Sequence, residues 1–225
     1  MGTNYNPQIV TSGLVLALDA ANPKSYPGSG TAWNDLSGLG NTGTLTSGPT
    51  YIASNNVILF DGINDYVSGA NSASTDLTTD MTIEVWFKID NVITSDYVRI
   101  FGKGDSTNRT YGLWYHVAQG LWLYQRYGGG FPGASVYSTV AFGQWYHMVG
   151  TSNGSSHVLY LNGISIATTT AATPVLSSAE GYRIGGATFH TFHNGPIASV
   201  RLYNRGLSAT EVLQNFNAHK GRYGL

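Results

Sequence analysis

The sequence predicts an all-β protein, a sandwich or barrel with one short helix near the C-terminus. Three observations support this. Short apolar or alternating stretches recur, giving about ten to twelve strands at intervals of roughly 8–12 residues. Clusters of Gly, Pro, Ser and Asn separate them and are typical of turns. Only one segment has the spacing of an amphipathic helix, and 225 residues is a common length for one all-β domain.

The elements follow in order along the chain. Residues 1–12 are polar and irregular, and we expect an N-terminal arm or lead-in ahead of a single domain at 13–225. Residues 13–21 (GLVLALDAA) form the first predicted strand, and the Gly-, Pro- and Asn-rich residues 22–49 a long ordered loop. Further strands are expected at 56–60, 65–69, 81–90, 97–104, 110–117, 121–127, 145–153, 157–170, 181–186 and 196–204.

Two of these segments carry specific local signals. Asn162-Gly163 interrupts the 157–170 segment, and Asn-Gly is the preferred pair for a type I′ hairpin turn. The 81–90 strand alternates with period two. One predicted face therefore holds Met81, Ile83, Val85, Phe87 and Ile89, and the other holds Thr82, Glu84, Trp86 and Lys88.

The predicted helix begins after Ser208. Ser208 and Glu211 have the spacing of a capping box, in which each side chain accepts a hydrogen bond from the other residue's backbone N–H. Val212, Leu213 and Phe216 then form an apolar stripe, and Gly221 can end the helix.

The composition excludes several classes of function. Charged residues are 10% of the chain and the net charge is −1, without a basic block, so we expect no nucleic-acid partner. The chain has no cysteine, which excludes disulfides and thiol catalysis. No apolar stretch approaches the roughly 18 residues of a membrane span, so no membrane insertion is expected. The N-terminus lacks a recognisable signal peptide.

Six segments in the same order resemble one family, the laminin G-like jelly-roll domains of the concanavalin A-like lectin and glucanase superfamily. They lie at 13–26, 33–45, 60–67, 82–88, 144–163 and 194–218. The resemblance implies a two-sheet antiparallel jelly-roll sandwich, carbohydrate binding or adhesion, and in some members calcium at one edge. This compact version is similar to forms found in phage structural proteins.

The hairpin at 112–130 (GLWYHVAQGLWLYQRYGGG) is the first candidate site. Counting alternate residues through its Gln-Gly turn places Leu113, Tyr115, Val117, Leu121 and Leu123 toward the core. The opposite, outward face is then expected to carry Trp114, His116, Trp122, Tyr124 and Arg126. Such aromatic rings can stack on sugars while His and Arg bind hydroxyls. A protein interface or simple coverage by loops are the alternatives.

The second candidate is the FDGINDYV segment. Asp61, Asn64 and Asp65 supply oxygen ligands suited to calcium, although the same residues are ordinary turn formers whose carboxylates accept backbone N–H groups. We expect the turn role, and no required cofactor, with calcium as the alternative.

Catalysis is the competing class of function. Polysaccharide hydrolases of this superfamily need two carboxylates on one groove. Glu84 and Asp90 share a predicted face, but they are six positions apart along the strand. The resulting separation of about 20 Å is too large for the two carboxylates to act on one bond. We therefore expect no enzyme, with a polysaccharide hydrolase as the second alternative.

Together with the composition, the resemblance implies a non-enzymatic structural or adhesive module on the surface of a phage-type virion, or otherwise extracellular. We expect it to decorate the particle or to engage glycans. Its expected partners are other virion subunits or copies of itself, and cell-surface glycans. A free-standing carbohydrate-binding lectin is the alternative.

Overall fold

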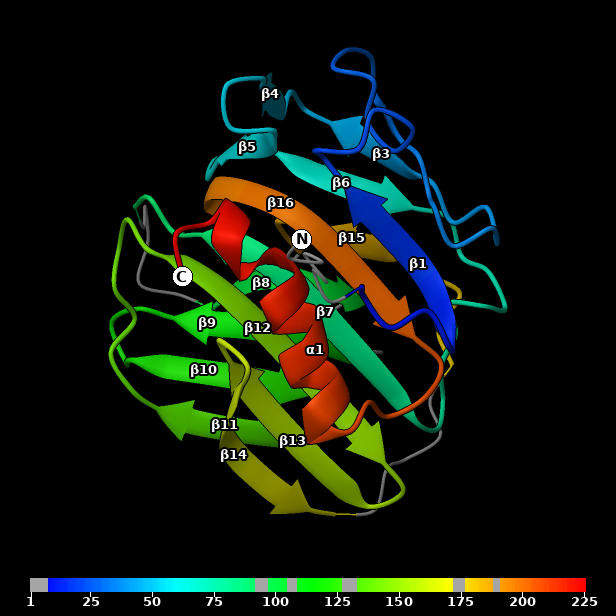
Figure 1. Cartoon of the computed structure of the whole chain (residues 1–225), viewed down its shortest axis with the longest axis vertical. Helices are drawn as coiled ribbons and strands as arrows, with labels where there is room; N and C mark the ends of the chain where they lie inside the picture. Colours follow the sequence, from blue (N-terminus) through cyan, green and yellow to red (C-terminus); the bar gives the residue numbers. More distant parts are fainter. Residues whose placement is uncertain (1–7, 92–96, 105–108, 127–132, 172–176, 188–190) are drawn as a thin grey trace, which may run out of the picture.

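The computed structural model describes residues 8–91, 97–104, 109–126, 133–171, 177–187 and 191–225. Two antiparallel sheets lie face to face, and one helix, α1 (Ala209–His219), lies against the outside of the first sheet (Figure 1). A short 3-10 turn, η1 (Lys220–Arg222), follows α1. The predicted two-sheet sandwich with one C-terminal helix is confirmed.

The sheet beneath α1, called sheet A, joins strands from both ends of the sequence. Its long strand β16 (Asn194–Tyr203) pairs with β7 on one side and with β5 and β1 on the other. The remaining strands extend from both edges in the order β14-β13-β12-β7-β16-β5-β4. Their bounds are β1 (Leu14–Asp19), β4 (Thr50–Ile52), β5 (Val57–Asp61), β7 (Met81–Lys88), β12 (Trp145–Asn153), β13 (Ser156–Leu161) and β14 (Ile164–Thr170).

The second sheet, sheet B, has the order β11-β10-β9-β8-β15-β6-β3-β2. Its centre holds β15, which is distant in sequence from both neighbours, β8 and β6. The bounds are β2 (Ala32–Trp33), β3 (Gly43–Thr46), β6 (Tyr66–Gly69), β8 (Val98–Lys103), β9 (Tyr111–His116), β10 (Leu121–Gln125), β11 (Gly133–Tyr137) and β15 (Tyr182–Ile184).

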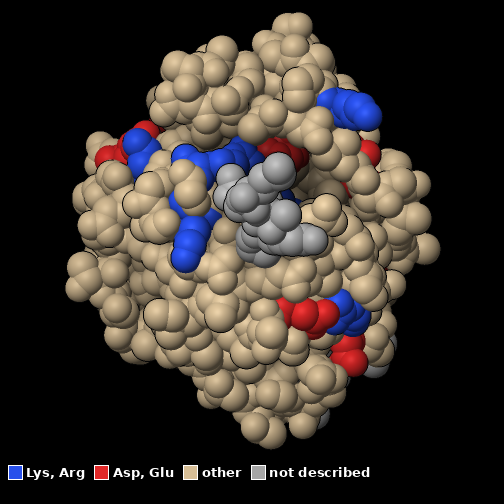
Figure 2. All heavy atoms as spheres, in the orientation of Figure 1, with Lys and Arg blue, Asp and Glu red and all other residues tan. Residues whose placement is uncertain are grey.

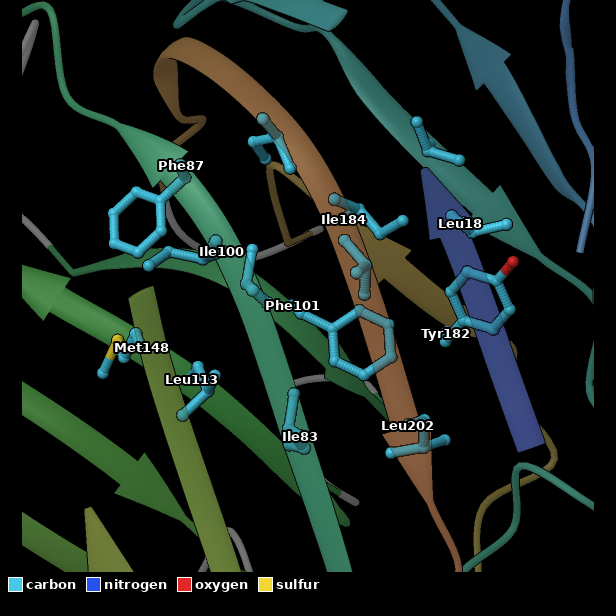
Figure 3. Packing of buried hydrophobic residues seen from close by; sticks show 14 of the residues in the cluster. Leu18, Ile83, Phe87, Ile100, Phe101, Leu113, Met148, Tyr182, Ile184 and Leu202 are labelled. Atoms are coloured by element: carbon cyan, nitrogen blue, oxygen red, sulfur yellow. The ribbon is translucent and has the colours of Figure 1, made fainter. Parts of the chain in front are cut away.

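The main core fills the space between the sheets. Figure 3 shows Ile83 and Phe87 of β7 facing Phe101, Leu113 and Ile184 of sheet B. The predicted inner face of residues 81–90 is confirmed, because Met81, Ile83, Val85, Phe87 and Ile89 all belong to this core. Glycines make room for the larger rings: a Cβ on Gly150 of β12 would lie 2.3 Å from the ring of Tyr124 in the opposite sheet.

The opposite face of β7 is also buried, because α1 covers it. Trp86 stacks on Phe216 of the helix, with ring centroids 5.7 Å apart, and on Tyr223, 4.3 Å away. The capping box that begins the helix is confirmed, since Ser208 accepts from the Glu211 N–H and Glu211 accepts from the Ser208 N–H.

Residues 8–12 of the expected arm lie against this helix. Val10 is buried, its N–H donates to Asn215 Oδ1 at 2.8 Å, and its carbonyl accepts from the Tyr203 hydroxyl at 3.0 Å. These five residues therefore form part of the layer over sheet A. Residues 1–7 lie outside the described part of the chain.

The long loop between β1 and β3 is ordered by one carboxylate. Asp35 accepts backbone N–H groups of Ala17 at 2.8 Å, Ser37 at 2.9 Å and Asn41 at 2.9 Å. These bonds fasten the loop to β1. No helix in the described ranges is long and apolar enough to cross a membrane.

Candidate functional site

The five side chains expected on one face of the 112–130 hairpin lie on two different faces. Trp114 and His116 of β9 point outward from sheet B, as expected. Trp122 and Tyr124 of β10 point inward and belong to the core between the sheets. The predicted outward position is therefore wrong for both. Residues 127–130 of the segment lie outside the described chain.

Arg126 also leaves the expected face. It is 2% exposed, and its guanidinium donates to the Thr79 carbonyl at 2.8 Å and contacts the sulfur of Met81. It therefore fastens the end of β10 to the segment that leads into β7. Tyr124 is held in the interior by a 2.7 Å hydrogen bond with Ser152. The five residues do not form one platform.

The outward part of the hairpin is a closed cluster. Trp114 is 2% exposed and packs with Leu121, Leu123 and Ala187. The guanidinium carbon of Arg99 lies 5.4 Å from the Trp114 ring centroid. Gly112 makes room for the indole, because a Cβ there would lie 2.7 Å from Trp114 Nε1. The face of this ring is not open to a ligand.

His116 is also engaged within the protein. It is 5% exposed, its Nδ1 accepts from the Gln119 N–H at 3.2 Å, and its ring meets the edge of Tyr97 with centroids 4.8 Å apart. Its role here is to order the β9–β10 loop.

The other end of the same outer face is partly open. Val67, Tyr182 and Ile184 point into the core. Because side chains alternate along a strand, Tyr66 and Ser68 of β6 and Arg183 of β15 point outward. The guanidinium carbon of Arg183 lies 4.4 Å from the centroid of the Tyr66 ring. Both side chains are half-buried.

Hydroxyls and a second aromatic ring surround this pair. Thr44 and Thr46 of β3 lie opposite Ser68 and Tyr66 in the β3–β6 pair, and so share their face. The Phe192 ring lies 6.4 Å from Tyr66. We call this set the Tyr66–Arg183 patch: Thr44, Thr46, Tyr66, Ser68, Arg183 and Phe192. It brings aromatic rings, hydroxyls and a cation together on the outer face of sheet B, and such groups bind polar, hydroxylated ligands.

None of the six residues of this patch is among the site residues predicted from the sequence. Alternation within the predicted strands DYVSG and GYRIGG is enough to place Tyr66 and Arg183 on the opposite face from their immediate neighbours in each strand. The direct pairing of β6 with β15, which places Arg183 opposite Ser68, comes only from the structure.

The Asp61–Asp65 segment forms a hydrogen-bonded turn. Asp61 Oδ1 accepts N–H groups of Ile63 at 2.8 Å and Asn64 at 3.2 Å, and Asp65 Oδ2 accepts the Asp61 N–H at 3.0 Å. Burial raises the pKa of Asp65. The carboxylates thus have the expected turn role. Within the described ranges, no three His, Asp or Glu side chains are grouped so that they could hold a metal.

Glu84 lies in a buried polar cluster under α1. Its carboxylate accepts from Arg201 Nη1 at 2.6 Å and from Asn215 Nδ2 at 2.6 Å, and lies 3.2 Å from His147 Nε2. Burial opposes its ionisation, but Arg201 and His147 outweigh that effect and lower the pKa of Glu84 to about 2. Glu84 is therefore ionised near neutral pH, and its bond to Asn215 anchors the helix to sheet A.

A cavity of about 430 Å³ lies beside this cluster. The polar groups in its wall include Asp19, Arg201 and His219, and its apolar wall includes Leu14 and Leu36. Asp19 is paired with Arg222 at 3.0 Å, and Arg201 lies 3.1 Å from His219 Nε2. On this side of the molecule, charged side chains gather in a few small groups on a mostly uncharged surface (Figure 2).

Comparisons with known proteins agree on the fold. A family model described as Concanavalin A-like lectin/glucanases superfamily (Laminin_G_3) matches residues 61–213. A search of curated proteins finds no significant match.

Three solved structures illustrate the likeness. Domain 4 of AbnA, a GH43 extracellular arabinanase from Geobacillus stearothermophilus in complex with arabinotriose, is 17% identical, with a TM-score of 0.71 and coverage of 91% of this chain and 98% of that domain. Trypanosoma rangeli sialidase in complex with sialic acid is 19% identical with a TM-score of 0.70, over 93% of this chain. The chain spans only 33% of the sialidase.

The third structure is the binding domain of Botulinum Neurotoxin DC in complex with SialylT. It is 12% identical with a TM-score of 0.71, and the match covers 92% of this chain and 52% of that one. At these identities, all three likenesses establish the fold alone.

Proposed function

Because the chain belongs to the concanavalin A-like lectin and glucanase superfamily, we propose that it is a non-catalytic carbohydrate-binding module whose ligand lies on the Tyr66–Arg183 patch. The observation that carries this proposal is the half-exposed pairing of Tyr66 with Arg183 on the outer face of sheet B. Two of the similar structures are complexes with sialic acid and arabinotriose, which favours a sugar as the ligand.

The chemistry of the patch suits a sugar. A sugar ring has an apolar C–H face that packs on an aromatic ring, and a rim of hydroxyls that needs hydrogen-bonding partners. Tyr66 and Phe192 supply rings, and the hydroxyls of Thr44, Thr46 and Ser68 lie on the same face. Charged residues make up only 10% of the chain, which favours a hydroxylated ligand over a partner with a highly charged surface.

The absence of catalysis is part of the proposal. A glycosidase acid must hold a proton near neutral pH, whereas the pKa of Glu84 is lowered to about 2 beneath α1. Glu211, the capping residue, is paired with Arg205 at 2.6 Å, and this hydrogen bond lowers its pKa to about 2 as well. Both carboxylates are thereby unsuited to act as general acids.

Display on a phage-type virion, or another extracellular surface, is a further proposal that rests on the sequence resemblance. It predicts an ordered oligomer by size-exclusion chromatography with light scattering. A free lectin is instead expected to bind glycans as a monomer.

Binding to a glycan array tests the proposed site. Tyr66→Ala removes the ring that supports the sugar, and we expect retention to fall about tenfold, since such stacking contributes about 1 kcal/mol or more. Leu213→Ala, an exposed position on α1, is the matched control. Array binding that Tyr66→Ala leaves unchanged would refute this location, and no binding by the wild-type protein would refute the function.

A further inference from the structure

Acidic residues occur in the described strands of only one of the two sheets. The described strands of sheet B contain no Asp or Glu, and their charged residues are Arg99, Lys103 and Arg183. The acidic residues of the described strands, Asp19, Asp61 and Glu84, all lie on sheet A. The sheet that carries the Tyr66–Arg183 patch therefore has a positive bias.

Two of the three sheet B cations are engaged inside the protein. Lys103 is fully buried, and its Nζ donates to the carbonyls of Glu180 at 2.7 Å and Ser178 at 3.0 Å. Arg99 is 1% exposed and donates to the Gly104 carbonyl at 2.8 Å. Neither can reach a ligand at the surface.

Arg183 differs from both. It is half-buried, it stacks on Tyr66, and among the described residues no carboxylate lies within ion-pair distance of it. A guanidinium stacked on a ring keeps its N–H donors at the edge of its plane free for an acceptor. The ring also limits the rotation of the side chain, so less entropy is lost when a ligand binds.

On the basis of the proposed carbohydrate-binding function, we infer that the patch selects sugars that bear an oxyanion. Arg183 is the group that binds this oxyanion. The fork of Arg matches a carboxylate in a two-point, charge-assisted contact, and a sulfate ester offers equivalent oxygens. Tyr66 and Phe192 then contact the ring of the same sugar, and Thr46 and Ser68 its hydroxyls.

The test compares acidic glycans with matched neutral ones. Wild-type protein is titrated with polygalacturonate and its fully methyl-esterified form, sialyllactose and lactose, and dextran sulfate and dextran. We expect at least tenfold tighter binding to the acidic member of one pair, weakening as salt is raised. A preference for the acidic member of the polygalacturonate or sialyllactose pair identifies a carboxylate as the oxyanion. A preference for dextran sulfate over dextran identifies a sulfate.

Arg183→Gln should abolish this preference, lowering affinity for the acidic glycan about 10- to 100-fold while affinity for the neutral one stays within about threefold. Lys24→Gln, which removes an exposed cation outside the strands of sheet B, is the matched control and should bind like wild type. Thermal unfolding verifies that all variants are folded.

The outcomes separate the two proposals. Equal binding to acidic and neutral members, or an acidic preference that survives Arg183→Gln, overturns the inference and leaves the carbohydrate-binding function standing. Binding to none of the glycans, on these pairs and on the array, overturns both.

Discussion

Trp122 lies directly opposite Tyr115 in the antiparallel β9–β10 pair, and their ring centroids are 6.3 Å apart. Residues opposite each other in a pair share a face of the sheet. Tyr115 points into the core, so Trp122 must do so as well, and its ring also contacts Tyr146 of sheet A at 4.8 Å. The indole therefore joins the two sheets.

Trp122→Ala is expected to destabilise the fold rather than remove a ligand contact. The indole is fully buried, and truncation of a buried Trp costs about 3–5 kcal/mol. Urea unfolding followed by circular dichroism measures the loss. Tyr66→Ala, at the half-exposed patch, is the control and should lose about 1 kcal/mol or less. A Trp122→Ala protein of wild-type stability would show that this ring is not part of the core.

The missed register has a simple physical origin. The loop between β9 and β10 comprises four residues, 117–120, so His116 lies opposite Leu121. With an even number of loop residues, an odd-numbered residue on one strand faces an even-numbered one on the other. Counting odd and even positions straight through the turn exchanged the two faces of β10. Composition could not reveal this error, because Leu and Trp are buried on both faces.

Local patterns were sufficient where one short segment decides the structure. Asn162 and Gly163 have φ of 52° and 79°, the positive values that a type I′ turn requires. Ser208 and Glu211 form the predicted capping box. The Tyr66–Arg183 patch could not be predicted in this way, because its strands are neighbours only through long-range pairing.

The Glu84–Arg201 pair predicts strong coupling between β7 and β16, the neighbouring strands of sheet A that carry the two side chains. Glu84→Gln leaves the buried Arg201 charge without its carboxylate, and we expect a loss of about 3–5 kcal/mol. Arg201→Met should cost a similar amount. The double variant removes both charges and should be less destabilised than the sum of the two, as a double-mutant cycle by urea unfolding can measure. Strict additivity would mean that the two groups do not interact.

The capping box predicts a smaller effect at the start of α1. Ser208→Ala removes the acceptor for the Glu211 N–H and should lower the free energy of unfolding by about 1 kcal/mol. Thr210→Ala, an exposed first-turn position, is the matched control and should stay within about 0.5 kcal/mol of wild type. Equal effects of the two substitutions in chemical unfolding would argue against a cap at Ser208.

Buried histidines predict that the protein loses stability in mild acid. Burial lowers the pKa of His193 to about 4, and burial together with Arg201 lowers the pKa of His219 to about 4. In the unfolded chain both titrate near 6.5, so between about pH 6.5 and 4 the unfolded state binds more protons than the folded state. Their contribution is therefore complete above about pH 6.5 and is lost as the pH falls toward 4.

His193→Gln tests this directly. The amide can still meet the Tyr115 hydroxyl, which lies 3.1 Å from His193 Nδ1, but it does not titrate. We expect the variant to lose about 1–3 kcal/mol less stability than wild type between pH 7 and 4, measured as the free energy of unfolding at several pH values. Below about pH 4.5, protonation of Glu84 in the unfolded chain adds a further decline in both proteins, because the folded state lowers the pKa of Glu84 to about 2. A wild-type profile that is flat from pH 7 to 4, or an unchanged slope in His193→Gln, would contradict a neutral, buried His193.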